Sequence, residues 1–319
     1  MRILRHLHDC PDDARHSVVA LGNFDGVHAG HREVIRRACA LAKEYGTQAA
    51  VMTFEPHPVH VLGKKDTYFR IDTFHEKAEK LAALGIDILF AQPFNETFSK
   101  VPAEEFIERI LVRNLAVRHV ITGENFIFGY KRSGNTALLA ESASHYGFEV
   151  TAVSPVGIGE DICSSTKVRE ALSQGDIKKT TALLEQPYYI SGRVQRGESR
   201  GKKLGFPTAN ISLKHRLRPA FGVYAVYVSV EGDTRKYTGV ANIGRKPTFG
   251  QFQELLEVHV FDANLALYGK RIRVYFIDYI RPERKFDQVE SLIEQITKDT
   301  QMAKEILMHG KEPSCSLEG

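Results

Sequence analysis

The sequence predicts two unlike modules, a parallel α/β module followed by a small antiparallel β-barrel with a terminal α-helix. Three patterns lead to this prediction. Short apolar runs alternate with amphipathic helical stretches in the first half, the long helical periods stop near Tyr188, and one such period returns at the end of the chain. With 319 residues, the chain is long enough for two domains that each bury a core.

The first half has the alternation expected of a parallel sheet with helices on both faces. In such a sheet, ligands bind beyond the carboxyl ends of the strands. Four segments fall at such ends: 22–31, 54–58, 123–129 and the residues after 153. The predicted strands are 17–21, 48–54, 86–91, 117–122 and 148–153, and the predicted helices are 32–45, 74–84, 102–114, 136–146, one that opens at 164–169, and 176–184.

The second half has short strands joined by turns, and we expect these strands to close into a small barrel. A long amphipathic helix then covers one side of the barrel. The domain limits predicted from this change of pattern are 1–185 and 186–310, followed by a disordered polar tail at 311–319. The predicted strands are 188–194, 222–230, 236–243, 255–261 and 272–280, and the terminal helix is 286–307.

The composition is that of a soluble globular protein, with 43% hydrophobic and 26% charged residues. The net charge of +4, from 43 basic and 39 acidic residues, suits phosphorylated ligands but is too small and dispersed for a nucleic-acid footprint. No apolar run reaches the length of a membrane span, and the N-terminus lacks the apolar core of a secretory signal. The four cysteines have no zinc or CxxC spacing, so we expect free thiols in a reducing cytoplasm.

A glycine-rich turn, GNFDGVHAGH at 22–31, joins the first predicted strand to the helix after it. Backbone N–H groups at such a turn point toward an anion. His28 and His31 are three residues apart where the helix begins, so both imidazoles lie on one face. Two such donors beside a helix N-terminus can hold a polyphosphate and stabilise charge that develops on it. Two alternatives are metal ligation, for which no third ligand stands at a fitting spacing, and an ordinary surface position.

Two further segments at strand ends offer apolar faces and an amide. Pro56 and Pro58 make a rigid loop after Phe54, and a plain rigid surface turn is the alternative interpretation. In GENFIFG at 123–129, an exposed aromatic such as Phe128 can stack on a planar ring, while Asn125 can bind the edge of that ring. The alternative is that both phenylalanines of this segment belong to the core.

The last helix of the first half opens with SSTKVR at 164–169. The hydroxyls of Ser164, Ser165 and Thr166 at a helix start can bind oxyanions, and Arg169 can reach a phosphate with its fork of donors. Taken alone, the same residues are also a plain capping run.

Two features of the second half carry chemistry. The segment 192–210, GRVQRGESRGKKLGFPTAN, is a glycine-rich basic loop that ends in Thr208 and Asn210, whose oxygens suit Mg²⁺ beside a nucleotide. A mobile loop beside a polar strand is the alternative. In LEVH, Glu257 lies in a strand otherwise rich in apolar residues, where a carboxylate can take a proton from an attacking alcohol. The alternatives are that Glu257 faces solvent or that nearby Glu254 is the base.

Together these motifs resemble the bacterial riboflavin kinase/FAD synthetase family. The 22–31 turn resembles the GxFDGxHxGH form of the HxGH signature of nucleotidylyltransferases, and SSTKVR resembles their ISSTxIR element, with Cys163 and Val168 as departures. GRVxxGxxxGxxLGFPTAN, GVYAV, GVANIGxxPTFG, LEVHVFD, LYG and RxExKF resemble the riboflavin kinase module and stand in its order. The resemblance covers about residues 15–308; HxGH is shared by many transferases, whereas PTAN with the LEVH strand is much more specific.

The resemblance implies a Rossmann-like adenylyltransferase domain, a riboflavin kinase barrel and two ATP-dependent reactions. The barrel phosphorylates riboflavin to FMN, with Glu257 as general base, and the first domain adenylylates FMN to FAD and releases pyrophosphate. His28 and His31 stabilise the phosphates, and Asn125, where many members carry Asp, is given no proton-transfer role. The other implied contacts are Gly22, Phe24, Asp25, Gly30, Ser164, Ser165, Thr166 and Arg169 for ATP in the first domain; Phe54, Pro56, Pro58, Asn125 and Phe128 for the flavin; and Gly201, Lys203, Thr208 and Asn210 for ATP and Mg²⁺ in the kinase.

The implied partners are riboflavin, FMN and ATP, with Mg²⁺ as cofactor, no nucleic acid and no membrane, in a cytoplasmic monomer or transient homo-oligomer. The sequence leaves three alternative functions. One is an enzyme with a single working site, which intact motifs in both halves disfavour. Another is a different HxGH transferase acting on pantetheine phosphate or nicotinate mononucleotide, which leaves the PTAN barrel unexplained. The last is a flavin-sensing regulator or RNA-binding module, which the mild charge disfavours.

Overall fold

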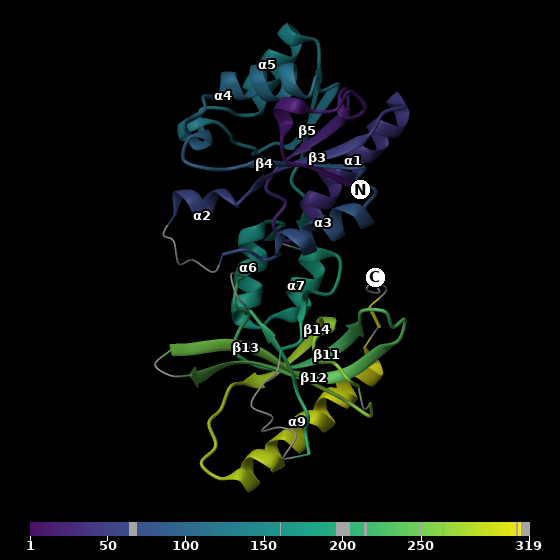
Figure 1. Cartoon of the computed structure of the whole chain (residues 1–319), viewed down its shortest axis with the longest axis vertical. Helices are drawn as coiled ribbons and strands as arrows, with labels where there is room; N and C mark the ends of the chain where they lie inside the picture. The colour runs from purple at the N-terminus through teal and green to yellow at the C-terminus, as the bar shows by residue number, and fades with distance from the viewer. Residues whose placement is uncertain are drawn as a thin grey trace. The chain divides into compact units, whose positions relative to one another are not determined.

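The computed structural model describes residues 1–63, 69–159, 161–195, 205–213, 216–248, 251–263, 265–310 and 312–313 (Figure 1). Contacts divide the chain into two compact units, Met1–Ser165 and Thr166–Gly319. The predicted tail at 311–319 lies almost wholly outside the described residues.

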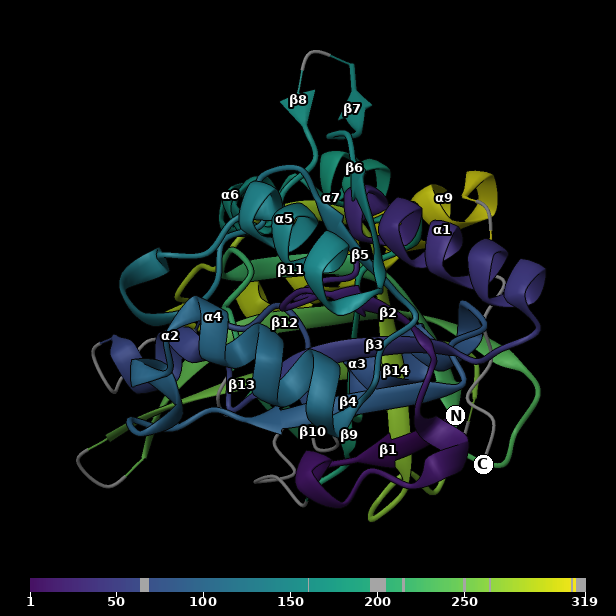
Figure 2. The same ribbon diagram turned by 90° about the horizontal axis from the view of Figure 1, so that it is seen from above.

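The first unit is built on a six-stranded sheet whose neighbouring strands are all parallel, as the sequence predicts. The strand order is β1-β4-β3-β2-β5-β6, which can be followed along the labels in Figure 2. The edge strand β1 was not predicted because three residues are too few to show a period. The strands are β1 (Arg2–Leu4), β2 (Val18–Leu21), β3 (Ala49–Glu55), β4 (Ile88–Pro93), β5 (His119–Gly123) and β6 (Glu149–Val153).

Helices cover both faces of this sheet, because successive strand residues point to opposite sides. In β2, Val18 and Ala20 join the core beneath α1 (Ala29–Tyr45) and α3 (Phe74–Ala83). Val19 and Leu21 join the second core, beneath the other helices. Those helices include α4 (Ala103–Glu105), the π-helix η4 (Phe106–Asn114), α5 (Thr136–Tyr146) and the 3₁₀ helix η1 (Leu7–Asp9).

The predicted helix at 102–114 is confirmed, and most of it is a π-helix. Three residues form the α-helix α4, and the next nine continue as the π-helix η4. The apolar side chains still face the sheet, because Phe106, Ile107, Ile110 and Leu111 are all buried. The remaining short elements of this unit are α2 (Pro58–Leu62), η2 (Asp12–Ala14), η3 (Phe98–Lys100), η5 (Tyr130–Arg132), and the hairpin of β7 (Gly157–Ile158) and β8 (Asp161–Ile162).

The second unit is the predicted antiparallel barrel. Its strand order is β10-β13-β12-β11-β14-β9, and a bridge between Gln195 and Asn210 joins the two ends of this order. Gly192 permits that closure, since a Cβ there would lie 2.3 Å from Cγ2 of Ile211. The strands are β9 (Tyr189–Arg193), β10 (Ala209–Ser212), β11 (Gly222–Val230), β12 (Lys236–Thr248), β13 (Gln251–Val260) and β14 (Arg271–Pro282).

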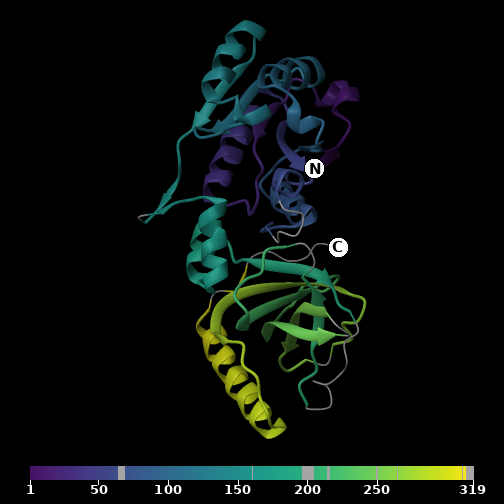
Figure 3. The same ribbon diagram turned by 90° about the vertical axis from the view of Figure 1, so that its left-hand side faces the viewer.

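Among the described residues, the α-helices that lie next to the barrel in sequence are α6 (Ser165–Gln174), α7 (Ile177–Leu184) and the terminal helix α9 (Val289–His309). Figure 3 shows α9 lying along the outside of the barrel, as predicted. Ala303 and Leu307 pack into the barrel core, and the buried carboxylate of Asp299 accepts hydrogen bonds from Arg281 at 2.7–3.1 Å. The helix begins at 289, three residues later than predicted.

Candidate active sites

The turn between β2 and α1 has backbone angles that two of its residues rarely adopt. Phe24 and Val27 have φ values of +48° and +47°, in the left-handed region that side chains with a Cβ rarely adopt. Such a conformation persists only where the surroundings fix it. Here the buried carboxylate of Asp25 accepts hydrogen bonds from the backbone N–H groups of Ile71, at 3.0 and 3.2 Å, and Asp72, at 3.4 Å. The predicted ATP contact Asp25 therefore holds the segment before α3 against the turn.

The structure brings His28 and His31 together on one face of α1, as their spacing predicts. Their rings stack with centroids 3.7 Å apart and planes 24° apart. His28 is the N-cap residue of α1, and its Nδ1 accepts from the backbone N–H of His31 at 3.4 Å. With Nδ1 as acceptor, a neutral His28 carries its proton on Nε2, which can donate to a phosphate oxygen.

Glycines make this close packing possible. A Cβ on Gly30 would lie 3.2 Å from Cε1 and 3.3 Å from Nδ1 of His28. A Cβ on Gly22 would lie 3.1 Å from the ring of Phe24, which is itself buried and 5.1 Å from the ring of His31. Phe24 thus packs beneath the catalytic candidate His31, and a side chain at either glycine would crowd the rings of the turn.

The SSTKVR element meets the turn through its first residues. Ser165 donates its hydroxyl to the carbonyl oxygen of Asp25 at 2.8 Å. Ser164 precedes it and is half-buried, while Thr166 and Arg169 follow on α6, in the second compact unit.

The predicted flavin residues Phe54 and Phe128 belong to one buried aromatic cluster. Both rings contact Phe106, at centroid distances of 6.4 and 5.5 Å. Each is less than a tenth exposed, so most of their surface belongs to the core. Phe126, which the sequence did not single out, is half-buried and stacks on Phe128 at 5.6 Å.

The other three predicted flavin residues lie nearer solvent. Pro56 and Asn125 are exposed, and Pro58 begins α2 and is half-buried. His57 between the prolines is buried, and its Nδ1 accepts from the backbone N–H of Val59 at 3.2 Å. His57 therefore fixes the loop to the start of α2.

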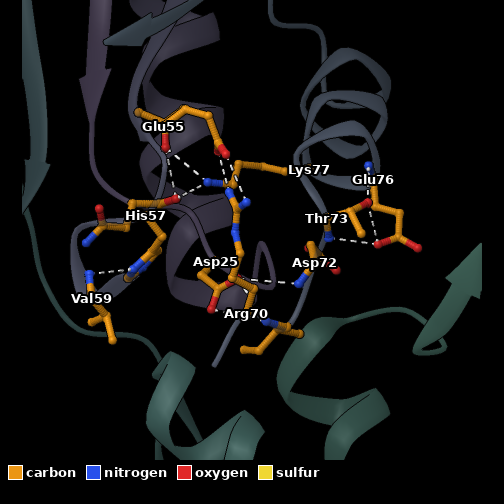
Figure 4. Close-up of polar contacts among 12 residues, drawn as sticks. Asp25, Glu55, His57, Val59, Arg70, Asp72, Thr73, Glu76 and Lys77 are labelled. Carbon is orange, nitrogen blue, oxygen red and sulfur yellow. Dashed lines mark hydrogen bonds and ion pairs between the residues drawn. The ribbon is translucent and has the colours of Figure 1, made fainter. Parts of the chain in front are cut away.

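Sequence reasoning missed a buried polar cluster beneath the turn (Figure 4). Lys77 of α3 is fully buried, and its Nζ donates to the carbonyl oxygen of Asn23 at 2.7 Å and to Oγ1 of Thr53 at 3.1 Å. Burial lowers the pKa of Lys77 to about 8, partly opposed by the nearby carboxylate of Asp25. The sequence feature that indicates this cluster is a lysine within the apolar stripe of α3, four residues before Leu81.

The kinase candidates share one face of the barrel sheet. Glu257 of β13 lies directly opposite Asn210 of β10 on one side and Asn242 of β12 on the other. Residues directly opposite in an antiparallel sheet point to the same face, so the three polar side chains form a row. Asn210 is 6% exposed, and its Oδ1 has no hydrogen-bond partner among the described residues.

The two candidate bases, Glu257 and Glu254, have different surroundings. The two residues are three apart in β13, so they point to opposite faces. Glu254 is engaged by Arg218 and Arg245. Burial alone would raise the pKa of Glu254, but the two guanidinium groups outweigh this and lower it. Glu257 lies half-buried in the polar row.

Thr208 is half-buried just before β10, and the carbonyl of the preceding Pro207 lies 2.9 Å from Nδ1 of His259. His259 lies two residues after Glu257 in β13 and so ties the PTAN segment to the strand of the candidate base. The other two predicted kinase contacts, Gly201 and Lys203, lie outside the described residues.

Comparison with known proteins identifies the family. The family model for FAD synthetase matches residues 10–167, and that for riboflavin kinase matches residues 184–307. The bifunctional riboflavin kinase/FMN adenylyltransferase of Bacillus subtilis is 39% identical over 93% of this chain and 94% of its own length. The Escherichia coli K12 protein of the same name is 36% identical over 96% and 97%. The chain belongs to the bifunctional riboflavin kinase/FMN adenylyltransferase family. The predicted family and both predicted enzyme activities are thereby confirmed.

A solved structure supports the fold over nearly the whole chain. The crystal structure named as a macrolide-efflux protein from Streptococcus pneumoniae is 31% identical, with a TM-score of 0.84, and the match covers 97% of this chain and 99% of that one. Among the described residues of the present chain, no helix has the length and apolar character needed to cross a membrane.

The packing around Gly30 predicts a selective loss of adenylylation. In Gly30→Ala, the new methyl group displaces the ring of His28, and the rate of FAD formation from FMN falls by about tenfold or more. The same sample should phosphorylate riboflavin at the wild-type rate. Gly157→Ala is the matched control, because the nearest atom to its Cβ is 3.8 Å away. Normal FAD formation by Gly30→Ala would show that the close packing of His28 is not needed.

The buried Lys77 predicts a pH dependence of stability. Its pKa is about 8 in the folded chain, below the ordinary 10.5, so the unfolded chain binds more protons between these values. The contribution of Lys77 to the free energy of unfolding therefore rises with pH across this window, by about 3 kcal/mol in total. Urea unfolding of the wild type and Lys77→Met at several pH values tests this. The wild type should gain stability relative to the variant as pH rises, and a constant difference would contradict the lowered pKa.

Proposed function

We propose that residues 1–185 adenylylate FMN at the His28–His31 turn and that residues 186–310 phosphorylate riboflavin at the Glu257 row. The observation that supports this most strongly is that each compact unit contains its own polar site at the motif of the matching family model.

In the adenylylation site, the phosphate of FMN attacks the α-phosphorus of ATP. A phosphorus–oxygen bond forms to FMN, the bond from the α-phosphorus to the bridging oxygen breaks, and pyrophosphate leaves with the negative charge. His28 and His31, at the positive end of α1, donate hydrogen bonds to the oxygens that gain this charge. Gly22 and Gly30 let the backbone approach the phosphates, while Ser164, Ser165, Thr166 and Arg169 bind the leaving side. Phe24 and Asp25 support the turn from beneath.

The flavin ring of FMN is held by the residues after β3 and β5. The edges of Phe54 and Phe128 offer apolar contact, Pro56 and Pro58 shape the loop, and the exposed amide of Asn125 binds the polar edge of the ring.

In the kinase site, Glu257 takes the proton of the ribityl 5′-hydroxyl as that oxygen attacks the γ-phosphorus of ATP. The bond to the β-phosphate breaks and ADP leaves. The buried Oδ1 of Asn210 is an oxygen donor of the kind that Mg²⁺ prefers, and the residues present therefore fit the ion. Thr208 and Asn210 would hold Mg²⁺, which neutralises phosphate charge when bound. Gly201 and Lys203 complete the proposed ATP contacts.

We also propose that the enzyme works in the cytoplasm on small molecules, without nucleic acid, as a monomer or transient homo-oligomer. The mild and dispersed positive charge supports the choice of phosphorylated small molecules as ligands.

Two substitutions should separate the activities. Glu257→Gln keeps the size of the side chain but removes the base, so FMN formation should fall by about a hundredfold or more, with FMN-to-FAD conversion unchanged. His31→Ala removes a donor to the transferring phosphates and should give the reverse result. Chromatographic separation of riboflavin, FMN and FAD measures both reactions. Loss of both activities in one folded variant would contradict the assignment of separate sites.

A further inference from the structure

Helix α3 places two lysines within the fold, and the two have different partners. Lys80 is almost fully buried, and its Nζ pairs with the carboxylate of Asp72 at 2.6 Å, within the same segment of chain. Lys77 is fully buried but donates to the backbone carbonyl of Asn23, 54 residues earlier and inside the turn. A buried ammonium is costly unless it is hydrogen-bonded, so its partners in the structure indicate its role.

The carbonyl of Asn23 is held from two sides. Besides Lys77, the hydroxyl of Thr53 donates to it at 3.0 Å, and Lys77 also donates to that hydroxyl oxygen at 3.1 Å. Asn23 directly precedes Phe24, where the backbone enters the left-handed region. The orientation of this carbonyl sets the peptide plane that leads into the strained part of the turn.

Charged groups surround the hydrogen bond between Lys77 and the Asn23 carbonyl. The carboxylates of Asp25, Glu55 and Asp72 favour the protonated form of Lys77, whereas Arg70 opposes it. Arg70 is itself paired with Glu55 at the end of β3, and Asp25 is bonded to the N–H groups of Ile71 and Asp72. Figure 4 shows Glu55 facing Arg70 and Asp25 joined to Asp72. The segment just before α3 therefore contacts both the turn and the end of the strand that leads into the flavin loop.

We propose that Lys77 is a positioning residue of the adenylylation site, which fixes the Asn23 carbonyl and thereby the direction of the turn N–H groups that bind ATP. This inference rests on the proposed function of the 22–31 turn. Lys77 lies beneath the turn and acts through Asn23, so it is not a catalytic residue. Lys77 affects the binding of ATP, because the backbone that it positions faces the polyphosphate.

The experiment compares Lys77→Met with Lys80→Met in the full chain. Both variants remove a buried ammonium from α3 and keep a side chain of similar length. We expect Lys77→Met to raise the KM for ATP in FAD formation by about tenfold or more, with the KM for FMN changed by less than about twofold, because a charged hydrogen bond to the turn is lost. Lys80→Met should leave both KM values within about twofold of the wild type.

Two further measurements separate positioning from folding. Thermal unfolding followed by circular dichroism fixes a temperature at which each variant is folded, and riboflavin phosphorylation by the same sample reports on the second unit. Thr53→Val should raise the KM for ATP by about threefold, and its effect should not add to that of Lys77→Met, because both side chains act on one carbonyl.

Three results would overturn the inference. Equal KM values for ATP in Lys77→Met and the wild type would show that Lys77 serves stability only. An equal rise in Lys80→Met would show that any loss of buried charge in α3 disturbs the turn. Absence of FAD formation by the wild type would refute the proposed function of the turn, and the inference with it; FAD formation with unchanged ATP kinetics in Lys77→Met refutes the inference alone.

Discussion

The proposed adenylylation site depends on buried polar contacts that hold a strained turn from beneath. A backbone with left-handed φ values at Phe24 and Val27 is unfavourable by itself, and the fold supplies fixed partners for it. Asp25 binds the segment before α3, Ser165 binds the carbonyl of Asp25, and Lys77 binds the carbonyl of Asn23. These contacts come from two stretches that are distant from the turn in sequence, residues 71–77 and Ser165. The turn that carries HxGH is therefore a product of the whole first unit.

The proposed kinase site is organised by sheet register. Glu257 is placed between Asn210 and Asn242 because β13 pairs with β10 on one side and β12 on the other. A shift by one residue would turn Glu257 to the opposite face of the sheet. The bridge between Gln195 and Asn210 closes the barrel and fixes β10, the strand that carries Asn210 of the PTAN segment. In the second unit, regular strand pairing positions the candidate site residues. In the first unit, buried polar contacts position them.

The sequence predicted those features that local periodicity determines. The spacing of His28 and His31 placed both rings on one face, and the change from helical to strand patterns separated the sheet from the barrel. The sequence did not predict the polar cluster, because Lys77 and Asn23 are 54 residues apart. The helical pattern of α3 alone shows only a charged residue within an apolar stripe. Barrel closure, the shared aromatic cluster of Phe54 and Phe128, and the ion pairs that occupy Glu254 likewise depend on contacts between distant segments. The π-helix at 106–114 has no local pattern that separates it from an α-helix.

We infer that one chain contains two working sites that act in sequence on a flavin. The most direct test incubates the purified chain with riboflavin, ATP and Mg²⁺, and separates riboflavin, FMN and FAD by chromatography over time. FMN should appear first and FAD should follow as FMN accumulates. If neither product forms, and if FMN supplied directly with ATP also gives no FAD, the chain has the fold of its family without either activity.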